Sequence, residues 1–209
     1  MSSLDYRALS NINAESALTF QPLLFSKYWN TLSDSEPVRI LDLAAMQPSS
    51  IDFYSNSDVP CYLTIADSIG SLTSLEINEE SSVDDVSEKL NHLIPSDNVA
   101  PYDIILFWEC LNNIDADVMP LFQEKIKKVS HENTLLYGFL YTSNNSSGFP
   151  FNFKIQSELS FTCEEGAKLA DNHKLINSYH LKKYFYDFDM SRSVLIRNGL
   201  QEFLMKRRA

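Results

Sequence analysis

Four short stretches of the chain are almost continuously apolar, and polar segments separate them. They cover residues 38–43, 61–67, 102–108 and 134–141. A strand that is covered on both faces has such a continuous apolar run, whereas a strand with one face in water alternates. The pattern therefore predicts four buried strands of a parallel sheet.

Helical patterns lie between these strands. Residues 83–94 carry apolar side chains at helical spacing, with Ser82 as the N-cap and Asp85 three positions later. Residues 118–129 repeat the spacing, and Asp117 is placed to cap that helix. Strands that alternate with amphipathic helices predict an α/β fold with a doubly wound sheet.

The C-terminal third follows a different pattern. Ser178 can cap a short helix, and two strand-like runs at 189–197 and 200–206 then flank the dipeptide Asn198-Gly199. Asn-Gly accepts the positive φ angles of a type I′ turn, which makes it a strong hairpin signal. The sheet is therefore expected to be mostly parallel and Rossmann-like, ending in an antiparallel hairpin.

One domain accounts for most of the chain. We find no internal repeat, and we assign residues 36–209 to the α/β domain. A weaker strand pair is expected within 151–163. Residues 1–35 carry an apolar stripe from Leu24 to Leu32 and are interpreted as an N-terminal helical extension.

The amino-acid composition argues against some classes of binding partner. The 209 residues include only 5 glycines, and the formal net charge is −11. A chain this acidic is a poor candidate for nucleic acid or anionic lipid. Residues 1–120 hold 4 basic and 19 acidic side chains. This imbalance fits either ordinary solvated surfaces or an acidic face that contacts a basic partner.

The sequence indicates neither a signal peptide nor a metal site. Three widely spaced cysteines do not suggest a disulfide framework, and the N-terminus lacks the pattern of a signal peptide. No apolar run reaches the ~18 residues that a membrane span needs. We therefore expect a cytoplasmic protein that does not bind a membrane. The four histidines show no metal-ligand spacing, and no metal site is expected; they are His92, His131, His173 and His180.

Candidate site residues follow the predicted strands. Open parallel sheets bind ligands beyond the carboxyl ends of their strands. The residues that fall at those ends are Asp42, Ala44, Met46, Asp67, Trp108, Glu109, Asn112 and Tyr141.

This arrangement resembles the class I S-adenosylmethionine-dependent methyltransferases. The resemblance rests on the segment Asp42-x-Ala44-x-Met46-x-Pro48, on Asp67 after the next strand, and on the run from Tyr102 to Asn112. It covers about residues 36–209. It implies a fold of that type and S-adenosylmethionine as the cofactor.

The resemblance also implies roles for the residues of the first two strand ends. Asp42 would hold the amino-acid end of the cofactor, and Asp67 would bind both ribose hydroxyls. The family has glycines at the positions of Ala44, Met46 and Pro48, where the backbone approaches the cofactor. The alternatives are that Asp42 only binds nearby backbone N–H groups and that Asp67 only caps a turn.

The end of the third strand would line the methyl-acceptor pocket. Trp108 could stack on the ligand, Glu109 could act as a general base, and Asn112 and Tyr141 could bind the acceptor. Alternatively, Trp108 packs in the core and Glu109 is solvated.

Three interpretations remain open. The chain could transfer a methyl group to a small molecule or a protein. It could instead be an inactive relative that binds a partner through its acidic N-terminal half. It could also be an unrelated α/β binding protein with the same strand order.

Overall fold

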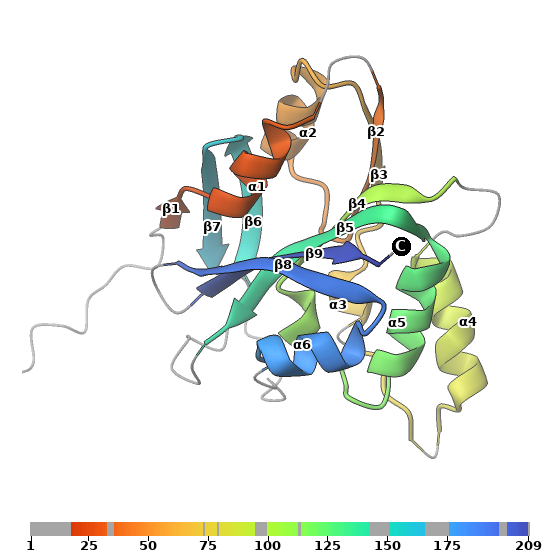
Figure 1. The fold of residues 1–209 in the computed structure, drawn as a ribbon. Helices are drawn as coiled ribbons and strands as arrows, with labels where there is room; N and C mark the ends of the chain where they lie inside the picture. The colour runs from red at the N-terminus through yellow and green to blue at the C-terminus, as the bar shows by residue number, and fades with distance from the viewer. Residues whose placement is uncertain are drawn as a thin grey trace, which may run out of the picture.

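A computed structural model gives the chain two β-sheets and describes most of its length. The described residues are 18–32, 36–72, 74–78, 80–94, 100–112, 114–142, 151–165, 176–196 and 200–208. In this part of the chain a six-stranded sheet has the order β3-β2-β4-β5-β9-β8, and a three-stranded sheet has the order β1-β7-β6 (Figure 1).

The four predicted strands form the parallel part of the larger sheet. They are β2 (Val38–Asp42), β3 (Cys61–Ile65), β4 (Tyr102–Trp108) and β5 (Ser130–Tyr141). The pairs β2–β3, β2–β4 and β4–β5 are all parallel. The predicted α/β fold with a mostly parallel sheet is thus confirmed. β5 begins four residues earlier than predicted.

The predicted hairpin closes this sheet. β8 (Phe188–Leu195) pairs antiparallel with β9 (Leu200–Arg207), and β9 pairs antiparallel with β5. The Asn198-Gly199 turn lies outside the described residues. β9 is therefore the strand that runs against the others.

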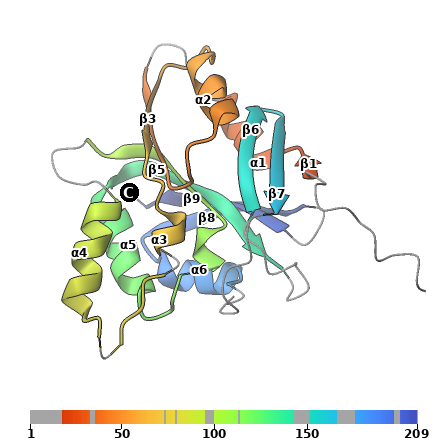
Figure 2. The ribbon, with the colours of Figure 1, turned by 180° about the vertical axis from the view of Figure 1, so that it is seen from behind.

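Helices cover both faces of the larger sheet. They are α1 (Leu23–Trp29), α2 (Pro48–Ser55), α3 (Ile69–Leu72), α4 (Val83–Leu93), α5 (Met119–Lys128) and α6 (Ser178–Tyr184), with a short 3-10 turn η2 (Cys110–Asn112) after β4. α3 to α6 pack with one face of the sheet, and α1 and α2 pack with the other (Figures 1 and 2). Both faces of the parallel strands are therefore buried, which explains their continuous apolar runs.

The three-stranded sheet lies on the same side as α1 and α2. It consists of β1 (Leu18–Phe20), β6 (Phe151–Ser157) and β7 (Ser160–Glu165). The hairpin of β6 and β7 confirms the strand pair expected within 151–163. β1 was not predicted, because three residues carry too little periodicity to indicate a strand. The expected N-terminal helical extension thus contributes a strand as well as α1.

Two of the three predicted helix caps differ from the structure. Ser82 and Asp85 form the expected capping box of α4. Asp117 does not cap α5, because the chain enters that helix through a turn in which Asp115 Oδ1 accepts the N–H of Asp117. α6 is capped by Asn177 rather than Ser178, since the Asn177 side chain already accepts two backbone N–H groups.

A buried glutamate joins the two ends of the described chain. α1 has no side-chain cap from its own N-cap residue. Instead, Glu202 Oε1 on β9 accepts the N–H groups of Leu24 and Phe25 at 3.0 and 3.1 Å, and the hydroxyl of Tyr137 at 2.8 Å. Burial raises the pKa of the Glu202 carboxyl, and these hydrogen bonds oppose the shift. A carboxylate at a helix N-terminus also interacts favourably with the helix dipole.

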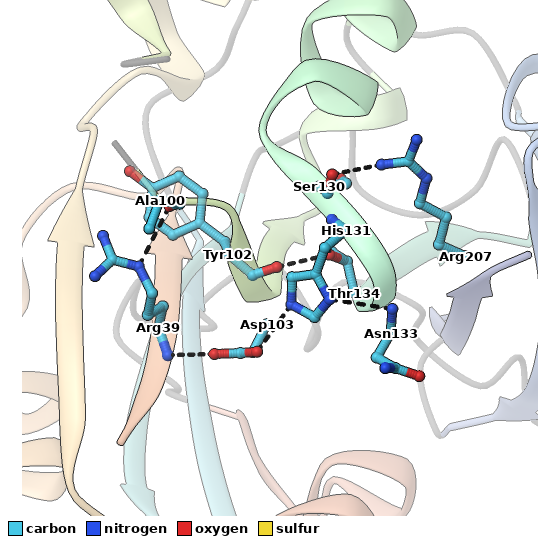
Figure 3. A network of polar contacts seen from close by, with 9 residues as sticks. All are labelled: Arg39, Ala100, Tyr102, Asp103, Ser130, His131, Asn133, Thr134 and Arg207. Atoms are coloured by element: carbon cyan, nitrogen blue, oxygen red, sulfur yellow. Dashed lines mark hydrogen bonds and ion pairs between the residues drawn. The ribbon is translucent and has the colours of Figure 1, made fainter. Parts of the chain in front are cut away.

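A polar network fixes the amino ends of three strands (Figure 3). Asp103 at the start of β4 accepts the N–H of Arg39 on β2 at 2.8 Å and contacts His131 Nε2 on β5 at 2.9 Å. The His131 Nδ1 atom accepts the N–H of Asn133 at 3.1 Å. Since Nδ1 is an acceptor, Nε2 carries the proton that it donates to Asp103. His131 Nε2 thus links β5 to β4, while Nδ1 bonds within β5.

Among the residues with described placement, no helix is long and apolar enough to cross a bilayer. The same residues contain no group of His, Cys, Asp or Glu side chains arranged to hold a metal ion.

Replacing Glu202 tests its role as the cap of α1. Glu202→Ala removes the acceptor of three buried donors and should lower the free energy of unfolding by about 3 kcal/mol. Glu202→Gln keeps an acceptor oxygen and should cost less than half as much. Urea denaturation of both variants measures the difference. Equal losses in the two variants would contradict the capping role.

Candidate functional site

The carboxyl ends of the parallel strands bring the predicted site residues to one edge of the sheet. Asp42 ends β2, Trp108 ends β4 and Tyr141 ends β5, while Asp67 follows β3 by two residues. These ends are in register, since Asp42 pairs with Ile65 on one side and Leu106 on the other. The carboxyl ends of these strands therefore form one continuous edge of the sheet, as predicted from the sequence.

Asp42 is buried and its carboxylate is already engaged. Its Oδ1 atom accepts the indole N–H of Trp108 at 2.6 Å and the backbone N–H of Ala44 at 2.9 Å. Burial raises the pKa of Asp42 to about 6, although both hydrogen bonds act in the opposite direction. The carboxylate thus binds partners within the chain at the position where the family would hold the cofactor.

Trp108 fills the space next to Asp42. Its side chain is 1% exposed, and its ring stacks on Phe153 of β6 at a centroid distance of 5.3 Å and on Phe139 of β5 at 6.4 Å. The Trp108 backbone has a φ of 51°, which is costly for a bulky residue. Such strain persists only where the surroundings hold it in place.

Gly138 allows the chain to make this turn. It pairs with Trp108 at a point where the register of β4 and β5 shifts. A Cβ atom on Gly138 would lie 2.5 Å from the Trp108 carbonyl oxygen and 3.1 Å from the Phe203 ring. One of the few glycines in the chain therefore accommodates the Trp108 backbone.

The loop after β2 follows the family pattern in position but not in residue type. Ala44 is half-buried and donates to Asp42, and Met46 is 64% exposed. Pro48 begins α2, as its fixed φ allows. Met46 therefore projects into solvent, and the residue that packs against Asp42 is Trp108.

Asp67 is the exposed carboxylate among the predicted cofactor residues. It is exposed, and its φ of 45° lies in the left-handed region. The chain then turns into α3, where the N–H groups of Ser68 and Ile69 both bond to the Leu43 carbonyl. Asp67 thus stands at the rim of the edge, free of the packing that encloses Asp42.

The predicted acceptor residues are buried together beyond β4. Asn112 donates to the carbonyls of Glu109 and Phe139 at 3.0 and 3.1 Å, and its Oδ1 accepts the N–H of Tyr141 at 3.1 Å. Asn112 therefore connects η2 to β5. The Glu109 side chain is also buried.

Burial also controls the titratable groups around Glu109. It raises the pKa of the Cys110 thiol and of the Tyr141 hydroxyl, and the nearby Glu109 charge adds to both shifts. Cys110 is thus held as a thiol and is not activated as a nucleophile.

The resemblance implies that Asp42 would hold the cofactor. In the structure its Oδ1 atom already accepts two N–H groups, and the Trp108 ring packs beside it. Of the two carboxylates that the resemblance assigns to the cofactor, Asp42 is buried and Asp67 is exposed.

Sequence reasoning missed a separate cleft on the α1–α2 side of the sheet. Its volume is about 610 Å³, and its lining includes Trp29, Asp52, Phe53, Asp58 and Glu158. The residues come from α1, α2, the segment before β3 and the β6–β7 turn. The acidic charge of the N-terminal half was the only sequence signal for this site, and it does not identify the residues.

The fold is that of the class I S-adenosylmethionine-dependent methyltransferases. The chain is similar to the 1,6-didemethyltoxoflavin-N1-methyltransferase of Burkholderia thailandensis, solved with 1,6-didemethyltoxoflavin and S-adenosylhomocysteine bound. The identity is 11%, the match covers 90% of this chain and 76% of that chain, and the TM-score is 0.51. At this identity the similarity establishes the fold and not the activity.

The N-methyltransferase NodS of Bradyrhizobium japonicum WM9 is also similar. It is 8% identical over 90% of this chain and 96% of that chain, with a TM-score of 0.48. No protein-family model matches the sequence, and no curated protein is similar to it in sequence.

The raised pKa of Asp42 predicts a pH-dependent stability. The pKa of Asp42 is about 6 in the folded protein, above the ordinary 3.8. Asp42 therefore makes its full contribution to the free energy of unfolding below about pH 4, and this contribution is lost as the pH rises through about 6. Asp42→Asn keeps an acceptor oxygen and cannot ionise. The unfolding free energy of Asp42→Asn minus that of wild type should therefore increase by about 2–3 kcal/mol between pH 4 and pH 7.

Urea denaturation at several pH values measures this difference. Glu202 is present in both proteins, so its own pH dependence cancels. A difference that stays constant with pH would mean that Asp42 is not buried as described.

The close approach of Gly138 to Trp108 predicts a large cost for one methyl group. Gly138→Ala should lower the free energy of unfolding by about 2–3 kcal/mol, because its Cβ would collide with a backbone carbonyl. Gly70→Ala is the matched control, since a Cβ there meets nothing within 4 Å. It should be neutral or slightly stabilising in thermal denaturation. Similar losses in both variants would argue against the bulge geometry.

Proposed function

We propose that this protein is an inactive relative of the methyltransferases that acts as a binding protein through its acidic N-terminal half. The observation that carries the proposal is the 2.6 Å hydrogen bond from Trp108 to Asp42. It engages the carboxylate that the family uses for its cofactor, and it places an indole ring in the adjacent space.

Opening this position would be costly. Cofactor binding would have to break a buried hydrogen bond to a carboxylate, which contributes about 1.5–3 kcal/mol. It would also separate Trp108 from two stacked aromatic rings, each pair contributing about 0.5–1.5 kcal/mol. These costs reduce the affinity by several powers of ten.

Charge supports a binding role for the N-terminal half. Residues 1–120 carry 19 acidic and 4 basic side chains, and the described acidic residues of α2 and α4 are exposed. Complementary charge steers association and selects partners. A basic partner protein or a small cation fits this surface, whereas nucleic acid does not.

The second candidate is a working methyltransferase that acts on a small molecule or a protein. Exposed Asp67 favours it, because this carboxylate is placed to accept two ribose hydroxyl groups. In that case Trp108 would have to leave its packed position when the cofactor enters.

Cofactor titration separates the two candidates. Calorimetry with S-adenosylmethionine and S-adenosylhomocysteine should give no binding heat up to about 1 mM. The indole N–H resonance of Trp108 should stay unchanged in the same titration, because Asp42 remains bonded to it. A titration of Asp67→Ala under the same conditions is the control for binding at the strand ends. Micromolar binding that Asp67→Ala abolishes would overturn the inactive assignment.

A further inference from the structure

The cleft beside α1 and α2 lies away from the strand ends that would hold a cofactor. Asp58 and Val59 in its lining precede β3, so the cleft lies at the amino end of that strand. Its volume of about 610 Å³ falls within the range of small-molecule sites, roughly 300–1,000 Å³. The cleft is thus a second candidate site, independent of Asp42 and Trp108.

Negative charge converges on this cleft. Asp52 on α2, Asp58 before β3 and Glu158 in the β6–β7 turn all line it. The described lining contains neither lysine nor arginine, and no ion pair joins these three carboxylates to any other described residue. Three carboxylates that no cation neutralises in the described structure attract a positively charged ligand.

The helix ends add to this charge. α1 ends at Trp29 and α2 ends at Ser55, and the residues that follow them, Asn30 and Asn56, line the cleft. The C-terminus of a helix carries a partial negative charge, which favours cations. The two helices therefore reinforce the carboxylates.

An apolar wall accompanies the charges. Phe53 is half-buried and packs on Trp29 at a centroid distance of 5.0 Å, and Leu32 and Val59 also line the cleft. Aromatic rings attract cations held within about 6 Å of their faces, and apolar side chains accommodate a hydrocarbon stem.

Ser49 also lies in the lining. It is half-buried, and its Oγ atom has no hydrogen-bond partner among the described residues.

We propose that this cleft binds an organic cation, an ammonium or guanidinium group on an apolar stem. The cation lies among Asp52, Asp58 and Glu158, and the stem lies against Phe53 and Trp29. The ligand is either a free amine or the side chain of a lysine or arginine in a partner. This deepens the proposed function, because it gives the acidic N-terminal half a specific site and a ligand chemistry.

The two tryptophans of the chain allow each site to be followed separately. Trp29 lines the cleft and Trp108 lies at the strand ends, and the sequence contains no third tryptophan. In ¹⁵N–¹H spectra of the wild-type protein, spermidine and N-acetyl-arginine amide should shift the Trp29 indole resonance and leave that of Trp108 in place. N-acetyl-norleucine amide, which has the stem without the charge, should shift neither.

The relative affinities distinguish the two sources of the cation. Tighter binding of spermidine identifies a free amine, and tighter binding of the arginine derivative identifies a side chain of a partner. Either result supports the cation site. Absence of any Trp29 shift with both probes at 10 mM would overturn it.

Charge-neutralising variants locate the site. Asp52→Asn and Glu158→Gln should each weaken binding of the preferred probe about tenfold, because each removes a charge-assisted contact. Glu124→Gln on α5 removes the same charge from the opposite face of the sheet and should change the affinity less than twofold. Equal weakening by all three variants would indicate general attraction to an acidic protein and would overturn the assigned cleft.

The same preparation separates failure of this proposal from failure of the proposed function. A shift of Trp108 with S-adenosylmethionine would contradict the inactive assignment and leave the cation site intact. An unchanged Trp29 indole resonance with both spermidine and N-acetyl-arginine amide would contradict the cation site alone.

Discussion

The packing at the carboxyl ends of β2 and β4 depends on the hydrogen bond between Trp108 and Asp42. It offsets part of the free-energy cost of burying the Asp42 carboxylate, and it fixes the indole ring across the end of β2. The ring then forms the base on which β6 packs through Phe153. The small sheet, the bulge in β4 and the glycine of β5 all fit around this one contact. The end of β2, at the edge where such sheets bind ligands, is therefore packed with side chains.

The fold could be predicted because burial leaves a clear record in the sequence. Strands covered on both faces read as continuous apolar runs, and the capping box of α4 is local in sequence. β1 could not be predicted, since three residues form a strand only because β7 is available to pair with them. The α5 cap was assigned to Asp117 because any carboxylate before a helix satisfies the local rule, while the actual turn depends on Asp115.

The site illustrates a different limit. The sequence places Asp42, Trp108 and Asp67 at one edge, because each lies at or near the end of a continuous apolar run. It left open whether Trp108 meets a ligand or packs in the core, since both choices look alike over a few residues. The packing partners that decide its position, Gly138 and Phe153, lie 30 and more residues further along the chain. The acidic cleft depends on three separate segments and has no local signature at all.

The cap of α1 has a consequence for how the chain is made. Its acceptor, Glu202, lies 178 residues after Leu24, near the start of β9. Contacts this distant in sequence form late, because the entropy of a long loop must be lost before the contact can stabilise the chain. During synthesis the first helix is therefore complete long before its cap exists. α1 can therefore reach its final stability only after β9 has been synthesised and has paired with β5, so the N-terminal elements depend on a strand made much later.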